Sequence, residues 1–396
     1  MEKINIGIVG GGLIGRVHTI AFQVLKGFFA EKARNVSLKV IAEKDGEYAR
    51  ETASRLGIDE WVGDWRELVK RDDIDLVIIG VPNYMHKEIA LEAVNRGKHV
   101  LCEKPLALCE KDARELYETA RSAGIMHAIS FNYRKTPAVL LVKRWIEEGA
   151  LGTILSFRSS FIQDWGLDEN LPLDWHFQKR YSGSGVLGDL GSHAIDMARF
   201  LVGEIREVSG ALSTLIGERP LCHDASKAST ASTAQISNAE SKNGGKKGKV
   251  DVDDLCDVLL RFENGAQGGI FVSRVAQGCK NHFEFELYGT EGSVFFDWER
   301  PNEVKLYRGE TQEGKSGFSE IQVGESCHPY GREIWPLPGM GTGFAEPFAI
   351  QLYEMVDALL NGGNVSPNFY DGWKTSQIID GVIDSSGDRK WRRIEG

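Results

Sequence analysis

Short apolar runs alternate with amphipathic stretches along the first third of the chain. The apolar runs predict buried strands, and the stretches between them, with apolar residues three or four positions apart, predict helices. Strands are expected at Ile4–Val9, Ser37–Ala42, Asp75–Val81, His99–Cys102 and Ile125–Ser130, and helices at Arg16–Phe29, His86–Arg96 and Glu110–Ala123. The third strand is apolar on both faces, as a parallel sheet covered by helices requires. The pattern predicts an N-terminal α/β domain.

The first strand leads directly into the glycine-rich segment Gly10-Gly11-Gly12-Leu13-Ile14-Gly15. In a strand–GxGxxG–helix unit, the first glycine permits a tight turn, the second lets the backbone approach a pyrophosphate, and the third lets the helix pack on the strand. Here these are Gly10, Gly12 and Gly15, while Leu13 and Ile14 lie where the helix N-terminus would stabilise the phosphate charge. The segment predicts a Rossmann domain that binds a dinucleotide.

The second expected strand is followed by Glu43. A carboxylate there accepts hydrogen bonds from the adenosine ribose and would repel a 2′-phosphate, which favours NAD over NADP. The spacing from Gly15 exceeds the usual ~20 residues, and an extended helix or loop near residues 28–35 would account for the excess. Lys44 weakens the preference for NAD because it adds a positive charge next door. The alternative is a solvated carboxylate at the strand end.

Further residues follow the ends of the later strands, where ligands bind in open parallel sheets. Pro82 and Asn83 follow the third strand, with His86 just beyond them, Glu103 and Lys104 follow the fourth, and Asn132 follows the fifth. We expect all of them to lie at the cofactor.

The rest of the chain has a different pattern, with shorter apolar runs separated by turns. Strands are predicted at residues 155–161, 205–215, 258–262, 266–274, 283–288, 293–298 and 304–308, with a helix at 344–360 that returns toward the first domain. Asn264-Gly265 is typical of a hairpin turn. Residues 225–248 are rich in Ser, Thr, Ala, Gly and Lys, which indicates a flexible insertion. A lid over the active site or an oligomer contact is the alternative.

The segment from Gly183 to Asp196 carries Asp189 and His193 four residues apart. If a helix begins near Asp189, both lie on one face. His193 is the candidate general base, since an unperturbed pKa of about 6.5 suits removal of a hydroxyl proton as hydride leaves the carbon. Lys104 is expected to bind the same oxygen and stabilise its developing negative charge. Asp189 would orient the substrate.

Each of these residues also has a plainer interpretation. Lys104 could pair with Glu103 at the surface, His193 could be a packed helix histidine, and Asp189 could cap the helix N-terminus. Asp196, three residues after His193, is expected to support the structure and not to react. How the roles of base and electrostatic stabiliser divide between Lys104 and His193 stays open.

Taken together, four segments resemble the motifs of the Gfo/Idh/MocA family, the glucose–fructose oxidoreductases and inositol dehydrogenases. They are Gly10–Gly15, Gly97–Leu106 with Glu103-Lys104-Pro105, Phe131–Arg134 and Gly183–Asp196. The resemblance implies a Rossmann domain over residues 1–131. Over residues 132–396 it implies a substrate and oligomerisation domain, an open, mostly antiparallel sheet covered by helices on one face. The other face would form a homodimer or homotetramer interface.

The resemblance also implies an NAD(P)-dependent dehydrogenase that acts on CH–OH groups with Lys104, Asp189 and His193 at its centre. Softer matches at residues 163–165, 200–205, 252–254 and 328–330 are similar to the subgroup that includes levoglucosan dehydrogenase and related sugar dehydrogenases.

Aromatic residues in loop-like contexts indicate the substrate. Their faces can stack on the C–H faces of a sugar, although any single tryptophan fits core packing equally well. The aromatic residues are Tyr133, Trp165, Trp175, Tyr330 and Trp335, with Asp164, Asp174 and His328 as partners for hydroxyls. Alongside the resemblance, they favour a sugar, anhydrosugar or cyclic polyol that is oxidised at a secondary hydroxyl, with C3 as the first position to consider.

Three functions fit these features. The first is an NAD-dependent dehydrogenase, which accumulates NADH. The second is an NAD-dependent glycoside hydrolase, which oxidises its sugar transiently and releases an aglycone without net NADH. The third is a non-catalytic regulator that binds dinucleotide as a signal. Relatives of the third kind usually lose the lysine or histidine, and both are present here.

Composition narrows the setting. The net charge of −10 argues against a nucleic-acid partner, which needs a clustered excess of Lys and Arg. The six cysteines are scattered and there is no HxxxH pair, so we expect no metal site. Strand-like sequence starts by Ile4 and no apolar run approaches ~20 residues. We therefore expect a cytoplasmic protein without a signal peptide or a membrane span.

Overall fold

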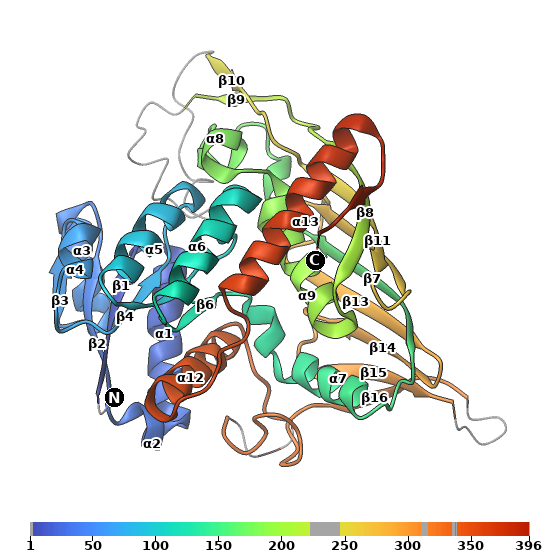
Figure 1. Ribbon diagram of the computed structural model, residues 1–396, viewed down its shortest axis with the longest axis horizontal. Helices are drawn as coiled ribbons and strands as arrows, with labels where there is room; N and C mark the ends of the chain where they lie inside the picture. The colour runs from blue at the N-terminus through green and yellow to red at the C-terminus, as the bar shows by residue number, and fades with distance from the viewer. Residues whose placement is uncertain (1–2, 222–245, 310–315, 335–336, 338, 396) are drawn as a thin grey trace.

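The computed structural model describes residues 3–221, 246–309, 316–334, 337 and 339–395. Two large sheets, each with its own helices, lie side by side and form the two halves of the molecule (Figure 1). The expected fold class, an N-terminal Rossmann domain joined to a mostly antiparallel sheet domain, is confirmed.

The first half is a parallel sheet in the order β3-β2-β1-β4-β5-β6. Its strands are β1 (Ile4–Val9), β2 (Val36–Ala42), β3 (Glu60–Val62), β4 (Leu76–Ile79), β5 (His99–Cys102) and β6 (His127–Ile129). The intervening helices are α1 (Leu13–Phe28), α2 (Ala30–Ala33), α3 (Gly46–Leu56), α4 (Trp65–Val69), α5 (His86–Asn95) and α6 (Glu110–Ser122). Neighbouring residues of one strand enter two different apolar cores, as in a sheet covered on both faces.

The second half is a nine-stranded sheet in the order β16-β15-β14-β13-β7-β12-β11-β8-β17. Only β7 and β12 pair in parallel. The strands are β7 (Ile154–Ile162), β8 (Ile205–Ser213), β11 (Leu255–Phe262), β12 (Gln267–Ser273), β13 (His282–Gly289), β14 (Gly292–Asp297), β15 (Glu303–Arg308), β16 (Ser319–Gln322) and β17 (Arg392–Arg393). Strands alternate between buried and exposed positions, so one face packs on a core and the other faces outward.

Three helices cover the packed face of this sheet: α7 (Pro137–Glu147), α9 (Ser192–Val202) and α13 (Phe369–Asp388) (Figure 1). The sequence patterns did not predict α7 or α13. The latter contains glycines, serines and aspartates that favour helix weakly. Asn368 and Asp371 form a capping box at its start, and Ile378, Ile379 and Val382 bury its apolar side against the sheet.

Helix α12 (Ala345–Asn361) returns to the first half of the molecule, as predicted. It packs against α1, and its residues Ile350, Leu352, Met355 and Val356 join the apolar core beside the parallel sheet. We propose that the nucleotide-binding unit consists of residues 4–131 together with α12, so that residues 132–396 do not form one separate unit.

Most of the expected insertion at 225–248 lies outside the described residues. Its described end lies in β10 (Lys247–Lys249), which pairs with β9 (Glu218–Pro220). The segment after β10 contacts the start of α8 (Lys179–Ser182), because the Lys179 amide donates to Asp251 Oδ1 at 2.6 Å.

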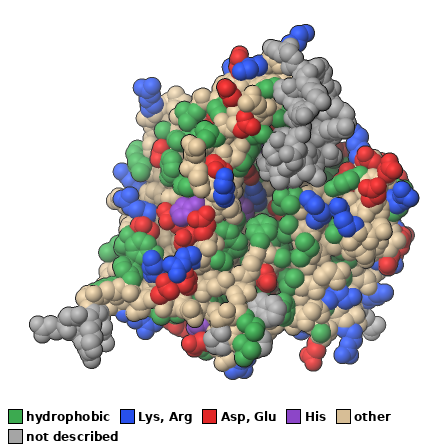
Figure 2. All heavy atoms as spheres, turned by 180° about the vertical axis from the view of Figure 1, so that it is seen from behind, with side chains coloured by type: hydrophobic (Ala, Val, Ile, Leu, Met, Phe, Trp, Pro, Cys, Tyr) green, Lys and Arg blue, Asp and Glu red, His purple; other side chains and the backbone are tan. Residues whose placement is uncertain are grey.

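Seen from behind, the molecule carries side chains of both charge signs across its surface (Figure 2). No helix in the described parts of the chain is long and apolar enough to cross a membrane.

Candidate active site

The site is built where the two halves of the molecule meet, on an ion pair between Lys104 and Asp189. Lys104 follows the end of β5, as predicted, and its Nζ donates to Asp189 Oδ1 at 2.7 Å and to the Asp189 carbonyl oxygen at 2.9 Å. Asp189 lies in a single π-helical turn, Leu187–Gly191, that leads into α9. The alternative interpretations fail here, because Lys104 does not pair with Glu103 and Asp189 makes no capping bond.

Charge keeps Asp189 ionised. Burial alone would raise the pKa of its carboxyl, but the ammonium of Lys104 and, next in effect, the imidazole of His176 lower that pKa to about 2. The ammonium of Lys104 has three N–H groups, and two of its bonds go to Asp189. One donor therefore remains for a substrate oxygen.

His193 lies on the first turn of α9 and is 6% exposed. Burial, and then the positive charge of Lys104, lower the pKa of its imidazole well below the usual value, although Asp189 opposes this. The ring is neutral at pH 7 and can accept a proton. Its Nδ1 has no hydrogen-bond partner among the described residues. The edge of the Tyr133 ring lies against it, with 4.8 Å between the centroids.

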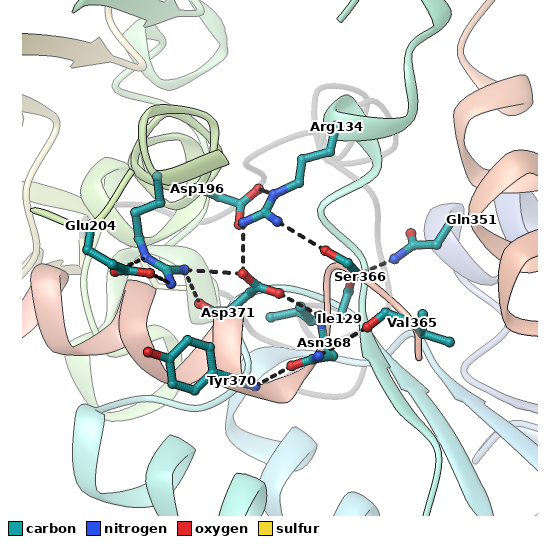
Figure 3. Close-up of polar contacts among 11 residues, drawn as sticks. Ile129, Arg134, Asp196, Glu204, Gln351, Val365, Ser366, Asn368, Tyr370 and Asp371 are labelled. Atoms are coloured by element: carbon teal, nitrogen blue, oxygen red, sulfur yellow. Dashed lines mark hydrogen bonds and ion pairs between the residues drawn. The ribbon is translucent and has the colours of Figure 1, made fainter. Parts of the chain in front are cut away.

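A buried network of charges anchors the helix that carries His193. Arg134 donates two hydrogen bonds to Asp196, which lies one turn along α9, and a third to Asp371 at the start of α13 (Figure 3). Burial raises the pKa of Asp196, and the guanidinium of Arg134 opposes that rise. Asp196 therefore supports the structure, as predicted. Because Tyr133 precedes Arg134, the network also holds the ring that packs on His193.

The glycine-rich turn has the geometry that a dinucleotide needs. Gly10 has a φ of +103°, and a Cβ on Gly15 would lie 1.9 Å from the Gly10 carbonyl oxygen. Gly12 is the extended residue that precedes α1, so Leu13 and Ile14 form its first turn. Glu43 Oε2 accepts a hydrogen bond from the Gly11 amide at 2.8 Å. The carboxylate thus lies against the turn, where the ribose of a dinucleotide would be expected.

The other expected cofactor residues divide into two groups. Pro82 and Asn83 follow β4, and the Asn83 amide donates to the Ser182 carbonyl oxygen of the second half. Asn132 is 3% exposed and its Nδ2 has no partner among the described residues. This amide therefore remains available to a ligand.

Glu103 and His86 form hydrogen bonds with other groups of the protein. Glu103 pairs with His18 of α1 at 2.8 Å, and this bond helps to hold the pKa of the buried carboxyl below its usual value despite burial. The two ring nitrogens of His86 lie 2.8 Å from the carbonyl oxygens of Pro105 and Val81. We infer that His86 supports the loops after β4 and β5, in place of the cofactor contact that was predicted.

A chain of polar side chains leads from Tyr133 to Trp165. Asn281 donates to the Tyr133 hydroxyl at 3.2 Å, Gln163 donates to Asn281 at 2.6 Å, and Trp165 donates to Gln163 at 2.8 Å. Tyr133 is buried against Phe161, Phe283 and Trp298, so it forms the floor beneath His193. These hydrogen bonds fix the position of Trp165 relative to Tyr133.

The residue that sequence reasoning missed is His176. Asp174 was expected to bind hydroxyls, but it is 1% exposed and its two oxygens accept from the backbone amide and from Nδ1 of His176, both at 2.9 Å. The His176 ring stacks on Trp175 at 3.7 Å and affects the pKa of Asp189. The local signal was the sequence Asp174-Trp175-His176, in which a buried carboxylate can orient an imidazole two residues away.

Three other expected substrate residues are not brought to the site. His328 Nδ1 accepts from the amides of Gly324 and Glu325 in its own loop. Tyr330 packs on Phe29 and bonds to Glu354 of α12. Asp164 pairs with exposed Lys280. Trp335 lies outside the described residues.

Two family models match the chain. Residues 4–131 match an oxidoreductase family with an NAD-binding Rossmann fold, and residues 139–295 match the GFO/IDH/MocA C-terminal domain.

Individual relatives are similar over nearly the whole chain. Levoglucosan dehydrogenase of Pseudarthrobacter phenanthrenivorans is 42% identical over 391 residues, which are 99% of this chain and 98% of that one. A solved levoglucosan dehydrogenase in complex with NADH and levoglucosan is 41% identical, with a TM-score of 0.91 and full coverage of both chains. An NAD-binding oxidoreductase from Klebsiella pneumoniae is 33% identical, with a TM-score of 0.90 and full coverage of both.

The depressed pKa of His193 predicts the pH dependence of the reaction. If His193 is the general base, it must be neutral to act, so kcat/KM for the substrate should stay level down to a pH of about 6.5, the ordinary histidine pKa, and fall only below it. Since Asp189 raises the pKa of His193, Asp189→Asn should move the acid limb of its residual activity to still lower pH. An acid limb above the ordinary value, or a shift to higher pH in the variant, would contradict this assignment.

Glu43 is expected to set the choice of cofactor. Glu43→Ala removes a charged acceptor, and such a bond is worth about 1.5–3 kcal/mol. NAD should therefore bind about tenfold or more weakly, while NADP should lose little because a repulsive charge is also removed. Fluorescence titration with each dinucleotide measures both effects. Glu43→Gln, which keeps an acceptor for the Gly11 amide, controls for damage to the turn. Equal losses for the two cofactors in Glu43→Ala would place Glu43 away from the ribose.

Proposed function

The chain belongs to the GFO/IDH/MocA family of oxidoreductases, and we propose that it oxidises a secondary hydroxyl of an uncharged sugar, anhydrosugar or cyclic polyol. It is an NAD-binding dehydrogenase of the sugar dehydrogenase type. The observation that carries the proposal is the ion pair of Lys104 and Asp189 beside the neutral imidazole of His193.

The residues at the ends of the parallel strands fit NAD. The turn Gly10–Gly15 would receive the pyrophosphate at the start of α1, with the backbone of Gly12 approaching it. Glu43 would bind the adenosine ribose, and Asn132 the nicotinamide end. When bound, NAD accepts the hydride that leaves the carbinol carbon. Lys104 lies at the carboxyl end of β5, on the same edge of the sheet as Asn132.

Side chains of the protein must remove the proton of the hydroxyl. His193 takes it as the general base, because its pKa lies low enough to leave the ring neutral. The N–H group of Lys104 that does not bond to Asp189 donates to the same oxygen. It stabilises the negative charge that develops there before the carbonyl forms. Asp189 holds the ammonium by two bonds and offers a negative charge near the imidazolium that forms.

Aromatic surfaces support a sugar ring as substrate. Tyr133, Trp165 and the stacked pair of Trp175 and His176 would form its walls, and the second imidazole nitrogen of His176 would bind a hydroxyl next to the reacting one. Because levoglucosan dehydrogenase is 42% identical over nearly the whole chain, levoglucosan is the first substrate to test.

A panel assay tests the proposal. The protein is mixed with NAD and, in turn, levoglucosan, 1,5-anhydroglucitol, glucose, glucosides and myo-inositol, and absorbance is followed at about 340 nm, where NADH absorbs. Accumulation of NADH with one neutral sugar supports the dehydrogenase. Release of an aglycone from a glucoside without net NADH would replace it by the redox-neutral hydrolase. Silence toward every sugar, with NAD still bound, would overturn the substrate class.

The two polar groups of the site should be separately essential. Lys104→Ala and His193→Ala should each lower kcat by roughly 10²–10⁴-fold, the range for loss of a positioned acid, base or charge stabiliser. NAD affinity and the circular dichroism spectrum show whether the fold persists. Lys111→Ala, at an exposed position of α6, is a matched control and should keep the wild-type rate. Near wild-type turnover in either of the first two variants would remove that residue from the mechanism.

A further inference from the structure

Two consecutive buried aspartates, Asp253 and Asp254, lie just before β11 and are 4% and 0% exposed. Neither has a hydrogen bond to Lys104, His193 or Trp165 in the described structure. Their bonds go instead to the two segments that carry the site.

Asp253 receives three consecutive backbone amides. Its Oδ1 accepts from Gly185 at 2.7 Å, its carbonyl oxygen from Val186 at 3.0 Å, and its Oδ2 from Leu187 at 2.7 Å. These amides open the helical segment that continues into α9, where N–H groups have no partner within the helix. A carboxylate is also favoured there by the helix dipole. Asp253 is thus a cap supplied by the segment just before β11, 66 residues beyond Leu187 in the chain.

The position of Asp189 depends on this cap. Asp189 is only two residues beyond Leu187, and its carboxylate and carbonyl oxygen hold Lys104. A Cβ on Gly185 would lie 1.9 Å from the Asp253 carbonyl oxygen, so the close approach requires glycine. A displaced cap would move the Lys104–Asp189 pair.

Asp254 supports a different segment of the site, the loop that carries Trp165 and His176. Its Oδ2 accepts from the amides of Leu215 and Ile216, and its Oδ1 accepts from Arg274 Nε at 2.9 Å. Arg274 Nη1 donates to the His176 carbonyl oxygen at 3.2 Å, and the guanidinium lies 5.5 Å from the Trp165 ring. The backbone of Arg274 also accepts from the Gly166 amide. Asp254 therefore fixes Arg274, which in turn fixes the loop that carries Trp165 and His176.

We propose that Asp253 and Asp254 are positioning residues with separable effects: Asp253 sets the turnover of the reacting groups, and Asp254 sets the affinity and specificity for the sugar. The inference rests on the proposed function, since it assumes that the loop at 163–178 contacts the sugar. It adds two residues that act only through Asp189 and Arg274.

Steady-state kinetics of Asp253→Asn and Asp254→Asn test the separation. In each variant an NH₂ group replaces one carboxylate oxygen. It faces an N–H donor, and it cannot accept the hydrogen bond that the oxygen accepted. For Asp253→Asn we expect kcat to fall about 10²-fold, the effect of a small misplacement of reacting groups, with little change in KM. For Asp254→Asn we expect KM to rise about tenfold with kcat nearly kept, as loss of uniform binding predicts. Asp384→Asn, at an exposed position of α13, is the control and should match the wild type.

A second pair of variants keeps the test decisive if an asparagine variant does not fold. Gly185→Ala should reproduce the fall in kcat, and Arg274→Lys, which keeps the charge but not both contacts, should reproduce the rise in KM. NAD titration should be unchanged in all of them, because the dinucleotide binds the other sheet. The proposal would be overturned if kcat and KM changed in the same way in Gly185→Ala as in Arg274→Lys, or in Asp253→Asn as in Asp254→Asn. Absence of NADH formation by the wild type would instead overturn the proposed function.

Discussion

The active site depends on one contact, the bond from the Lys104 ammonium to Asp189. It joins the carboxyl end of β5, in the parallel sheet, to the helical turn before α9, on the other sheet. A partly buried ion pair adds little net stability, because desolvation offsets much of the attraction. Its effect lies in electrostatics: the ammonium lowers the pKa of Asp189, and it adds to the burial that lowers the pKa of His193. The two domains thereby contribute to one set of polar groups, which is suited to accept a proton while a hydride leaves.

Buried charges recur around this contact, and each holds an element that carries a site residue. Arg134 with Asp196 and Asp371 ties α9 and α13 to the segment after β6. Asp253 caps the turn of Asp189, and Asp254 with Arg274 supports the loop of His176. Apolar packing alone is non-directional. Fully bonded polar groups specify one arrangement, which a site built from two domains requires.

The sequence predicted what local pattern determines. The turn Gly10–Gly15, the place of Lys104 after β5 and most strands followed from periodicity and from the rule that ligands bind at strand ends. Contacts between distant segments did not follow: Asp253 and Gly185 are 68 residues apart, and Arg274 and His176 are 98 apart. His328 and Tyr330 were grouped with the substrate by residue type, but their partners lie in a local loop and on α12. Helix α13 has weak local preference and depends on its packing and its cap.

The decisive experiment is a crystal structure of the complex with NADH and the sugar that reacts. We predict that the reacting oxygen lies within hydrogen-bonding distance of both Lys104 Nζ and the His193 imidazole, while Lys104 keeps its bond to Asp189. The sugar ring should lie against Trp165 and His176. An oxygen bound away from Lys104 and His193, with its ring outside these aromatic walls, would contradict the account.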